Sequence, residues 1–220
     1  MSKEIHLNEE KFKMISGFIN TAYRDYLAAR ILFNAGQLYR AIIISNTSIE
    51  KYLKAYLWAT GKQSKIHVVE KLFAEACKLY PELNAINAEF IKKISESYSL
   101  RYFDNEVFTK ENAKFRITVE QYKSLAELDF TVDLLQNLLV VEFQGRRLQG
   151  MYHADRESKN QHLFLNNFVL SGIDKKALVE SEQMIYRVRV NTIGGMNGLE
   201  EQIFRTKDVK DDGKHFYPYP

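Results

Sequence analysis

The sequence predicts a mainly α protein, an antiparallel up-and-down helical bundle followed by a small α+β C-terminal extension. Glycine (10) and proline (3) are scarce among the 220 residues, which leaves too few turn signals for a β-sandwich or barrel. Apolar residues recur at helical spacing through the first two thirds of the chain. The loops between the expected helices are short, and short loops make neighbouring helices antiparallel.

The first two helices are the longest. Apolar residues from Phe12 to Phe33 recur every three or four positions, which predicts a helix over about residues 9–35. Gly36 follows, where a helix C-terminal cap favours a left-handed residue. A second helix is expected over about residues 38–60, ended by Gly61 in the same way.

Two further helices follow a short loop. The third begins near His67 and must end before Pro81, because proline lacks the amide hydrogen that a helix interior uses. The fourth covers about residues 85–101. Residues 102–116 have no helical pattern, and we expect them to be irregular.

A fifth helix is predicted over about residues 118–143. Thr118 and Gln121 have the spacing of a capping box, in which two side chains satisfy the free amides of the first turn. An apolar stripe continues through Leu125, Leu128, Val132, Leu135 and Leu139. Residues 1–144 are therefore expected to form one bundle.

The helical spacing of apolar residues fades after Gly145, and residues 145–220 are expected to form the extension or a docking arm. Six of the ten glycines lie between Gly145 and Gly198. Residues 184–193 include an alternating stretch, Ile-Tyr-Arg-Val-Arg-Val, that is typical of a half-buried strand. The tail, residues 207–220, is expected to be loosely held.

Composition limits the classes of function. The net charge of +3 is evenly spread and falls short of a dedicated duplex-binding protein. A single cysteine, Cys77, cannot form an internal disulfide and fits a reducing compartment. The N-terminus is polar and charged, without the features of a signal peptide, and the apolar runs are too short to span a bilayer. These features predict a cytoplasmic protein without a membrane segment.

Short motifs in the helical region resemble those of HEPN domains. Residues 48–57, Ser-Ile-Glu-Lys-Tyr-Leu-Lys-Ala-Tyr-Leu, are similar to the family's A-x-E-K-x-L-K-A-x-L signature, and residues 36–41 to the G-x-Y-x-x-A before it. The resemblance covers about residues 9–143. Its other pieces are Ala22-x-x-Asp25-x-x-x-Ala29, residues 65–72, Arg101-Tyr102-Phe103-Asp104 and residues 109–113.

The resemblance implies a helical bundle that dimerises and works with nucleotides or RNA, often beside a nucleotidyltransferase partner. Ribonuclease members of the family carry an arginine and, after four to six intervening residues, a histidine. In this sequence Arg101 is followed at those positions by Glu106, Val107 and Phe108. The side chain expected to act as acid or base is therefore absent, which favours a non-catalytic role.

The resemblance and the chemistry of charged side chains indicate four candidate residues for contacts with a nucleotide or RNA: Arg101, Lys51, Lys54 and Asp104. The planar guanidinium of Arg101 suits bidentate contacts with phosphate, and Asp104 would orient it. The alternative is a salt bridge from Arg101 to Asp104 or Glu106 that closes the helix. For Lys54, the alternative is a structural pair with Glu50 at i,i+4 spacing.

Two other patterns leave alternatives open. The polar run over residues 45–48 predicts either a buried hydrogen-bond network or a ligand pocket. Arg187 and Arg189 on the expected strand could face RNA, an acidic partner or only solvent. No cofactor and no metal site is expected, because no set of ligands has suitable spacing.

The preferred hypothesis is a non-catalytic nucleotide- or RNA-binding interaction module, homodimeric and working with a nucleotidyltransferase-type partner. A first alternative is a ribonuclease of the toxin–antitoxin kind with a rebuilt active site, using Tyr102 or Glu106 as the acid. A second is a structural adaptor that dimerises through the bundle and docks a partner on its extension. That adaptor would keep a folded bundle after removal of residues 145–220.

Overall fold

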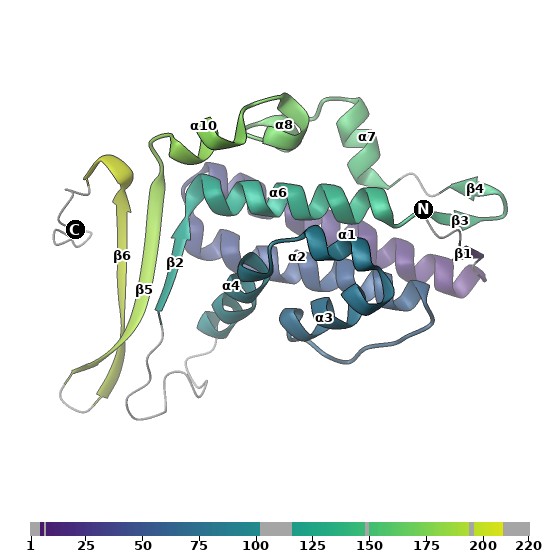
Figure 1. Ribbon diagram of the computed structural model, residues 1–220, viewed down its shortest axis with the longest axis horizontal. Helices are drawn as coiled ribbons and strands as arrows, with labels where there is room; N and C mark the ends of the chain where they lie inside the picture. Colours follow the sequence, from purple (N-terminus) through teal and green to yellow (C-terminus); the bar gives the residue numbers. More distant parts are fainter. Residues whose placement is uncertain (1–4, 7, 102–115, 148–149, 194–195, 209–220) are drawn as a thin grey trace.

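The computed structural model describes residues 5–6, 8–101, 116–147, 150–193 and 196–208 (Figure 1). It confirms the mainly α fold: long antiparallel helices form a bundle, and a three-stranded antiparallel sheet lies at one end of it (Figure 1). None of the described helices is long and apolar enough to cross a membrane.

The two longest helices run side by side through the centre, α1 over Glu9–Asn34 and α2 over Leu38–Ala59. Both match their predicted bounds to within one residue. Gly36 has a φ of +72°, and the amide of the next residue, Gln37, donates to the carbonyl of Leu32. This is the Schellman arrangement that the glycine predicts, and Gly61 ends α2 in the same way.

Two shorter helices pack on α2. The first, α3, covers Val69–Leu79 and is followed by a 3₁₀ turn over Pro81–Ala85. The second, α4, covers Ala88–Tyr98 and continues as a 3₁₀ turn over Ser99–Arg101. Asn87 caps α4 by accepting hydrogen bonds from the amides of Glu89 and Phe90, so α4 begins three residues later than predicted.

The predicted start and end of the fifth helix are wrong. Residues Arg116–Glu120 form strand β2, and the helix, α6, covers Gln121–Leu138. Thr118 lies opposite Arg187 in the sheet, so the capping box with Gln121 does not form. The β-branched side chains of residues 117–119 favour a strand wherever a partner strand is available, and the partner here is distant in sequence.

Strands also replace the predicted C-terminal turns of that helix. Strand β3, Val141–Phe143, pairs in parallel with β1, Ile5–His6, and antiparallel with β4, Arg146–Arg147. The predicted irregular segment over residues 102–116 lies outside the described residues, except Arg116, which belongs to β2. Most of the predicted loose tail also lies outside them.

Besides β4, the described residues of the extension contain four short helices and two long strands. Strand β5, Met184–Ile193, confirms the predicted strand and lies between β2 and β6, Met196–Arg205. A 3₁₀ turn over Thr206–Asp208 follows. The short helices are α7 (Met151–Glu157), α8 (Gln161–Phe164), α9 (Phe168–Ser171) and α10 (Lys175–Glu180).

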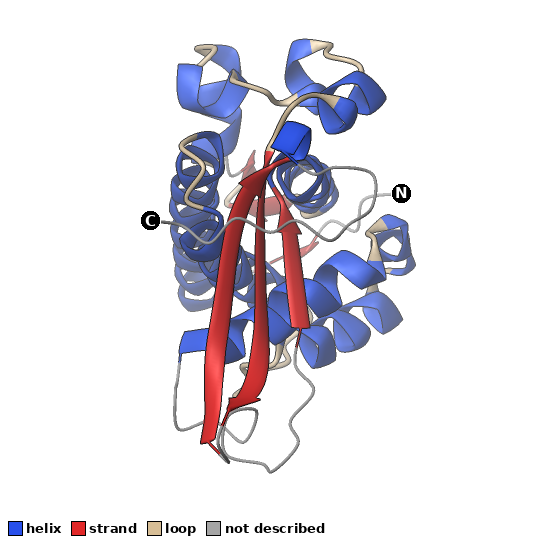
Figure 2. Ribbon diagram, turned by 90° about the vertical axis from the view of Figure 1, so that its left-hand side faces the viewer, coloured by secondary structure: helices blue, strands red, loops and turns tan. Residues whose placement is uncertain are grey.

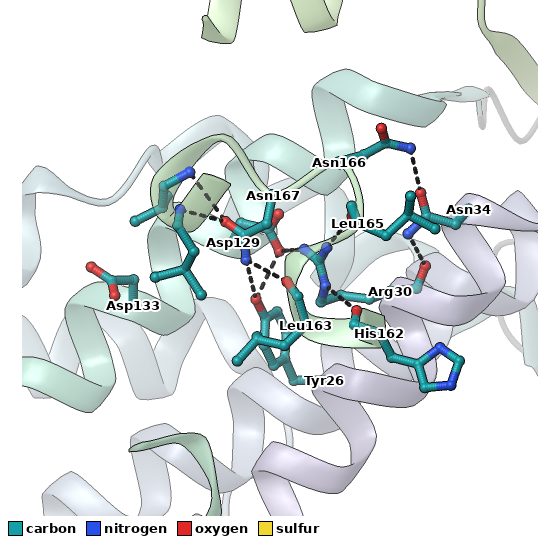
Figure 3. Close-up of polar contacts among 12 residues, drawn as sticks. Tyr26, Arg30, Asn34, Asp129, Asp133, His162, Leu163, Leu165, Asn166 and Asn167 are labelled. Carbon is teal, nitrogen blue, oxygen red and sulfur yellow. Dashed lines mark hydrogen bonds and ion pairs between the residues drawn. The ribbon is translucent and has the colours of Figure 1, made fainter. Parts of the chain in front are cut away.

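Buried polar contacts join these short helices to the bundle. The Tyr23 hydroxyl on α1 donates to Asp155 on α7 at 2.5 Å. Deeper in the core, Arg30 on α1 contacts Asp129 on α6 and also donates to the carbonyl oxygens of His162 and Leu165 (Figure 3). The boundary at residue 144 stays a prediction, but the two parts share these contacts.

Candidate functional site

A cleft of about 400 Å³ opens between α2, the start of α3 and the end of α4. This volume falls within the usual range for small-molecule sites, about 300–1,000 Å³. Its walls combine polar and apolar groups: Asn46, His67, Val68, Ser95, Glu96, Tyr98 and Ser99.

Asn46 supplies the deepest polar group of the cleft. Its side chain is 1% exposed, and its amide nitrogen donates to the carbonyl of Ile94 on α4 at 3.0 Å. Its Oδ1 has no hydrogen-bond partner among the described residues. A buried acceptor without a donor destabilises the protein by about 1–3 kcal/mol. A bound donor in the cleft would remove that penalty.

The rest of the polar run on α2 forms the buried hydrogen-bond network that was one of its two interpretations. Ser45 donates to the carbonyl of Ala41, and Ser48 donates across to Ala22 on α1, both at 2.8 Å. Asn46 belongs to this network through its amide and lines the cleft as well. The hydrogen-bond network is therefore confirmed, and the ligand pocket stays a prediction that rests on Asn46.

His67 is held at the cleft by a carboxylate from α2. Its Nδ1 lies 2.9 Å from Glu50 Oε1, and the same oxygen accepts from Lys54 Nζ at 2.7 Å. The side chains of Glu50 and Lys54 are each 11% exposed, while that of His67 is 71% exposed. The buried pair thus fixes one edge of the imidazole and leaves most of the ring accessible. The structural interpretation of the Glu50–Lys54 pair agrees with this geometry.

Arg101 lies next to the cleft, at the end of the 3₁₀ turn that follows α4. Its guanidinium carbon is 4.8 Å from the centre of the Tyr98 ring, within the range of a cation–π contact. Tyr98 in turn lines the cleft. Asp104 and Glu106, the two expected partners of Arg101, lie outside the described residues.

Lys51 faces a different side of α2 from Lys54. Its Nζ lies 2.5 Å from Asp25 Oδ2 on α1, with both side chains about one quarter exposed. Neighbouring positions on a helix are rotated by about 100°, which separates Lys51 from the face of Glu50 and Lys54. The structure brings Lys54 and Arg101 to the cleft region and leaves Lys51 at the α1–α2 contact.

The sequence analysis offered Asn46 only as part of the polar run over residues 45–48, and it missed His67 and Tyr98 as site residues. Helical spacing contained a signal for two of them, because residues four or three apart share a face. Asn46 precedes Glu50 by four positions, and Tyr98 precedes Arg101 by three. Among the described residues, no group of three or more histidine, cysteine or acidic side chains is placed to hold a metal ion.

The fold and the cleft define a helical-bundle domain with a small, partly apolar cleft between its second, third and fourth helices. A family model, the HEPN domain, matches residues 15–120, from α1 to the end of β2. This part of the chain belongs to the HEPN domain family, as its motifs predicted. Searches of the curated proteins and of the solved structures gave no match.

Proposed function

We propose that the chain is a nucleotide- or RNA-binding interaction module of the HEPN type, non-catalytic and homodimeric, which works with a nucleotidyltransferase-type partner. The observation that carries the binding role is the cleft between α2, α3 and α4. It combines a buried acceptor on Asn46, the accessible ring of His67 and the phenol of Tyr98. The family, whose members generally have nucleotide- or RNA-related roles, supports the same class of ligand.

Each group of the cleft suits one part of a nucleotide. The orphan oxygen of Asn46 would accept a hydrogen bond from a base amine or a ribose hydroxyl. Arg101 and Lys54 supply cations for phosphate. Arg101 is the better placed of the two, because it is exposed, whereas Lys54 is buried against Glu50.

A ribonuclease remains the second candidate, because one observation favours it. The sequence lacks a histidine after Arg101 at the family spacing, but the fold places His67 in the cleft that Tyr98 and Arg101 border. Glu50 contacts one imidazole nitrogen, which is how a carboxylate orients a histidine for proton transfer. This candidate uses His67 in place of Tyr102 or Glu106.

Incubation with labelled structured RNA separates the two candidates. Wild type, Arg101→Ala and His67→Ala would be scored for both cleavage and retention of the RNA, with the exposed Lys176→Ala on α10 as the matched control. The module predicts intact RNA retained by wild type and the control, and weaker retention by Arg101→Ala. Cleavage that disappears in His67→Ala would establish the ribonuclease.

Titrations with mononucleotides, and the molar mass in solution measured by light scattering, complete the test. The module predicts nucleotide or RNA binding and a dimeric mass. A dimer that binds no nucleotide and no RNA, but captures a protein partner, would move the conclusion to the structural adaptor. Binding of neither nucleotides nor RNA nor a partner would rule out the module.

A further inference from the structure

Three arginines gather on the outer face of the sheet. In β2 and β5, Ile117 and Val188 are paired and buried, so their side chains face the bundle. Neighbouring residues in a strand point to the opposite side, which places Arg116, Arg187 and Arg189 on the outer face. The long helices lie behind the sheet when this face is viewed (Figure 2).

The register sets these like charges close together. Arg116 lies directly opposite Arg189, and Arg187 precedes Arg189 by two residues in β5. Like charges directly opposite one another destabilise an antiparallel pair. Partial burial lowers the pKa of Arg187, and the charges of Arg116 and Arg189 lower it further. Glu200 on β6 pairs with Arg189 and offsets part of this repulsion, and an anionic ligand would relieve the rest.

The neighbouring contacts orient two of the three guanidinium groups. Arg189 forms a bidentate pair with Glu200 on β6, at 2.7 and 2.9 Å. The Arg187 guanidinium lies over the ring of Phe204, with its carbon 5.4 Å from the ring centre. Guanidinium groups held in place in this way lose less conformational freedom when they bind phosphate.

Basic side chains continue from Arg116 into a groove of about 440 Å³ between β2, α4 and the start of α6. The groove is also lined by Lys92, Lys93 and Lys123, and by three glutamates, one of which, Glu127, pairs with Lys175 at 2.9 Å. Ser124 lines it too, at 2% exposure, and its hydroxyl has no partner among the described residues. The groove offers phosphate both cations and a hydroxyl donor.

We infer that the outer face of the sheet, through Arg116, Arg187 and Arg189, binds the phosphate backbone of single-stranded RNA. The inference rests on the proposed RNA-related function and adds a surface separate from the cleft beside Arg101. Arg187 and Arg189 are about 7 Å apart along β5, a spacing that lets them contact separate phosphates of an extended strand. The modest net charge of +3 favours such a local contact over wrapping of a duplex.

The test measures binding of a fluorescein-labelled oligouridine by anisotropy at several salt concentrations. The triple variant Arg116→Gln, Arg187→Gln and Arg189→Gln is expected to bind at least tenfold more weakly. Each phosphate contact on a single strand contributes about 0.7 to the slope of log affinity against log salt, so that slope should fall by about 2. A matched control replaces three exposed lysines by glutamine, all of them on helices away from the sheet's outer face: Lys13, Lys78 and Lys176.

Two further variants keep the test decisive. The corresponding triple Arg→Lys variant retains the charges and should retain most of the salt slope, which separates loss of charge from misfolding. The pair Lys54→Ala and Arg101→Ala removes cations at the cleft; it should weaken mononucleotide binding and leave the sheet's contribution to the salt slope in place.

The outcomes distinguish this inference from the proposed function. A Gln triple variant with the affinity and slope of wild type would overturn the sheet surface, whatever the cleft binds. Wild type that binds mononucleotides but no oligouridine would also overturn it, while the proposed function would stand. An oligoglutamate peptide that displaces the RNA at equal concentration would assign the surface to an acidic protein partner and overturn the RNA assignment.

Discussion

Arg30 and Asp129 form an ion pair in which neither side chain is exposed to solvent. Arg30 comes from α1 and Asp129 from α6, and the Tyr26 hydroxyl donates to the same carboxylate oxygen at 2.8 Å (Figure 3). Burial is the largest influence on the pKa of Arg30 and lowers it, but the Asp129 carboxylate and the Tyr26 hydroxyl together outweigh burial and raise that pKa. Both charges therefore depend on each other inside the core.

Removing one member of the pair should destabilise the protein strongly. Asp129→Ala leaves the Arg30 charge buried without its partner, and we expect the free energy of unfolding to fall by about 3–5 kcal/mol. Urea denaturation followed by circular dichroism measures the change. Glu180→Gln, at an exposed pair on α10, is the control and should change stability by less than about 1 kcal/mol.

An apolar replacement of both members should be milder. The double variant Arg30→Met and Asp129→Leu removes both charges together, so we expect it to be more stable than Asp129→Ala alone. The single variants Arg30→Met and Asp129→Leu complete the comparison. If the double variant loses as much free energy of unfolding as the two single variants together, the pair contributes no coupling.

Truncation after residue 144 should unfold the bundle partially or fully. The shortened chain loses β5, the strand beside β2, and the carbonyls of His162 and Leu165 that Arg30 contacts. The adaptor hypothesis expects a folded bundle from the same deletion. Circular dichroism and a thermal melt of residues 1–144 decide between them, and a sharp transition near that of the full chain would favour an independent bundle.

Gln121 should be sensitive although it lies outside the cleft. Its side chain donates to the carbonyl of Phe33, at the end of α1, and accepts from the amide of Met184, at the start of β5. Gln121→Met keeps the size but leaves both backbone groups without these bonds. We expect the free energy of unfolding to fall by about 2–6 kcal/mol, since each of the two unsatisfied buried groups contributes about 1–3 kcal/mol. Lys123→Met, an exposed neighbour on α6, is the matched control for denaturant unfolding.

The sequence predicted well where local rules decide the structure. Apolar spacing and the left-handed glycines at positions 36 and 61 placed α1 and α2, and strict alternation placed β5. It failed where a distant segment competes with a local signal. Thr118 and Gln121 have the spacing of a capping box, but Thr118 pairs with Arg187, far along the chain. The residues predicted as the first turn of a helix therefore form a strand. The short helices α7 to α10 are too brief to show periodicity.

The candidate site was predictable only in part. Lys54 and Arg101 could be found from their motifs, but Lys51 shares the motif and faces Asp25 on α1. The cleft depends on Asn46, His67 and Tyr98, which come from three separate elements. Their meeting is set by the packing of α3 and α4 on α2, which no local pattern contains.

The buried tyrosines should make the protein sensitive to alkali. Burial raises the pKa values of several tyrosines above the ordinary value of 10.0: Tyr23, Tyr26, Tyr52, Tyr56, Tyr152 and Tyr186. The folded protein keeps these protons at a pH where the unfolded chain releases them. It then binds more protons than the unfolded chain, so its stability falls as pH rises above about 10.

Each such tyrosine should lower the free energy of unfolding by up to about 1.4 kcal/mol for every pH unit above its unfolded pKa. Urea midpoints measured at increasing pH, together with phenolate absorbance, test this. We expect the exposed tyrosines to ionise first and the rest to ionise together with the loss of helical circular dichroism. Tyr152→Phe should reduce the slope of the free energy of unfolding against pH by the contribution of one proton, up to about 1.4 kcal/mol per pH unit. Ionisation of all thirteen tyrosines near pH 10, with the helices intact, would show that the core does not protect them.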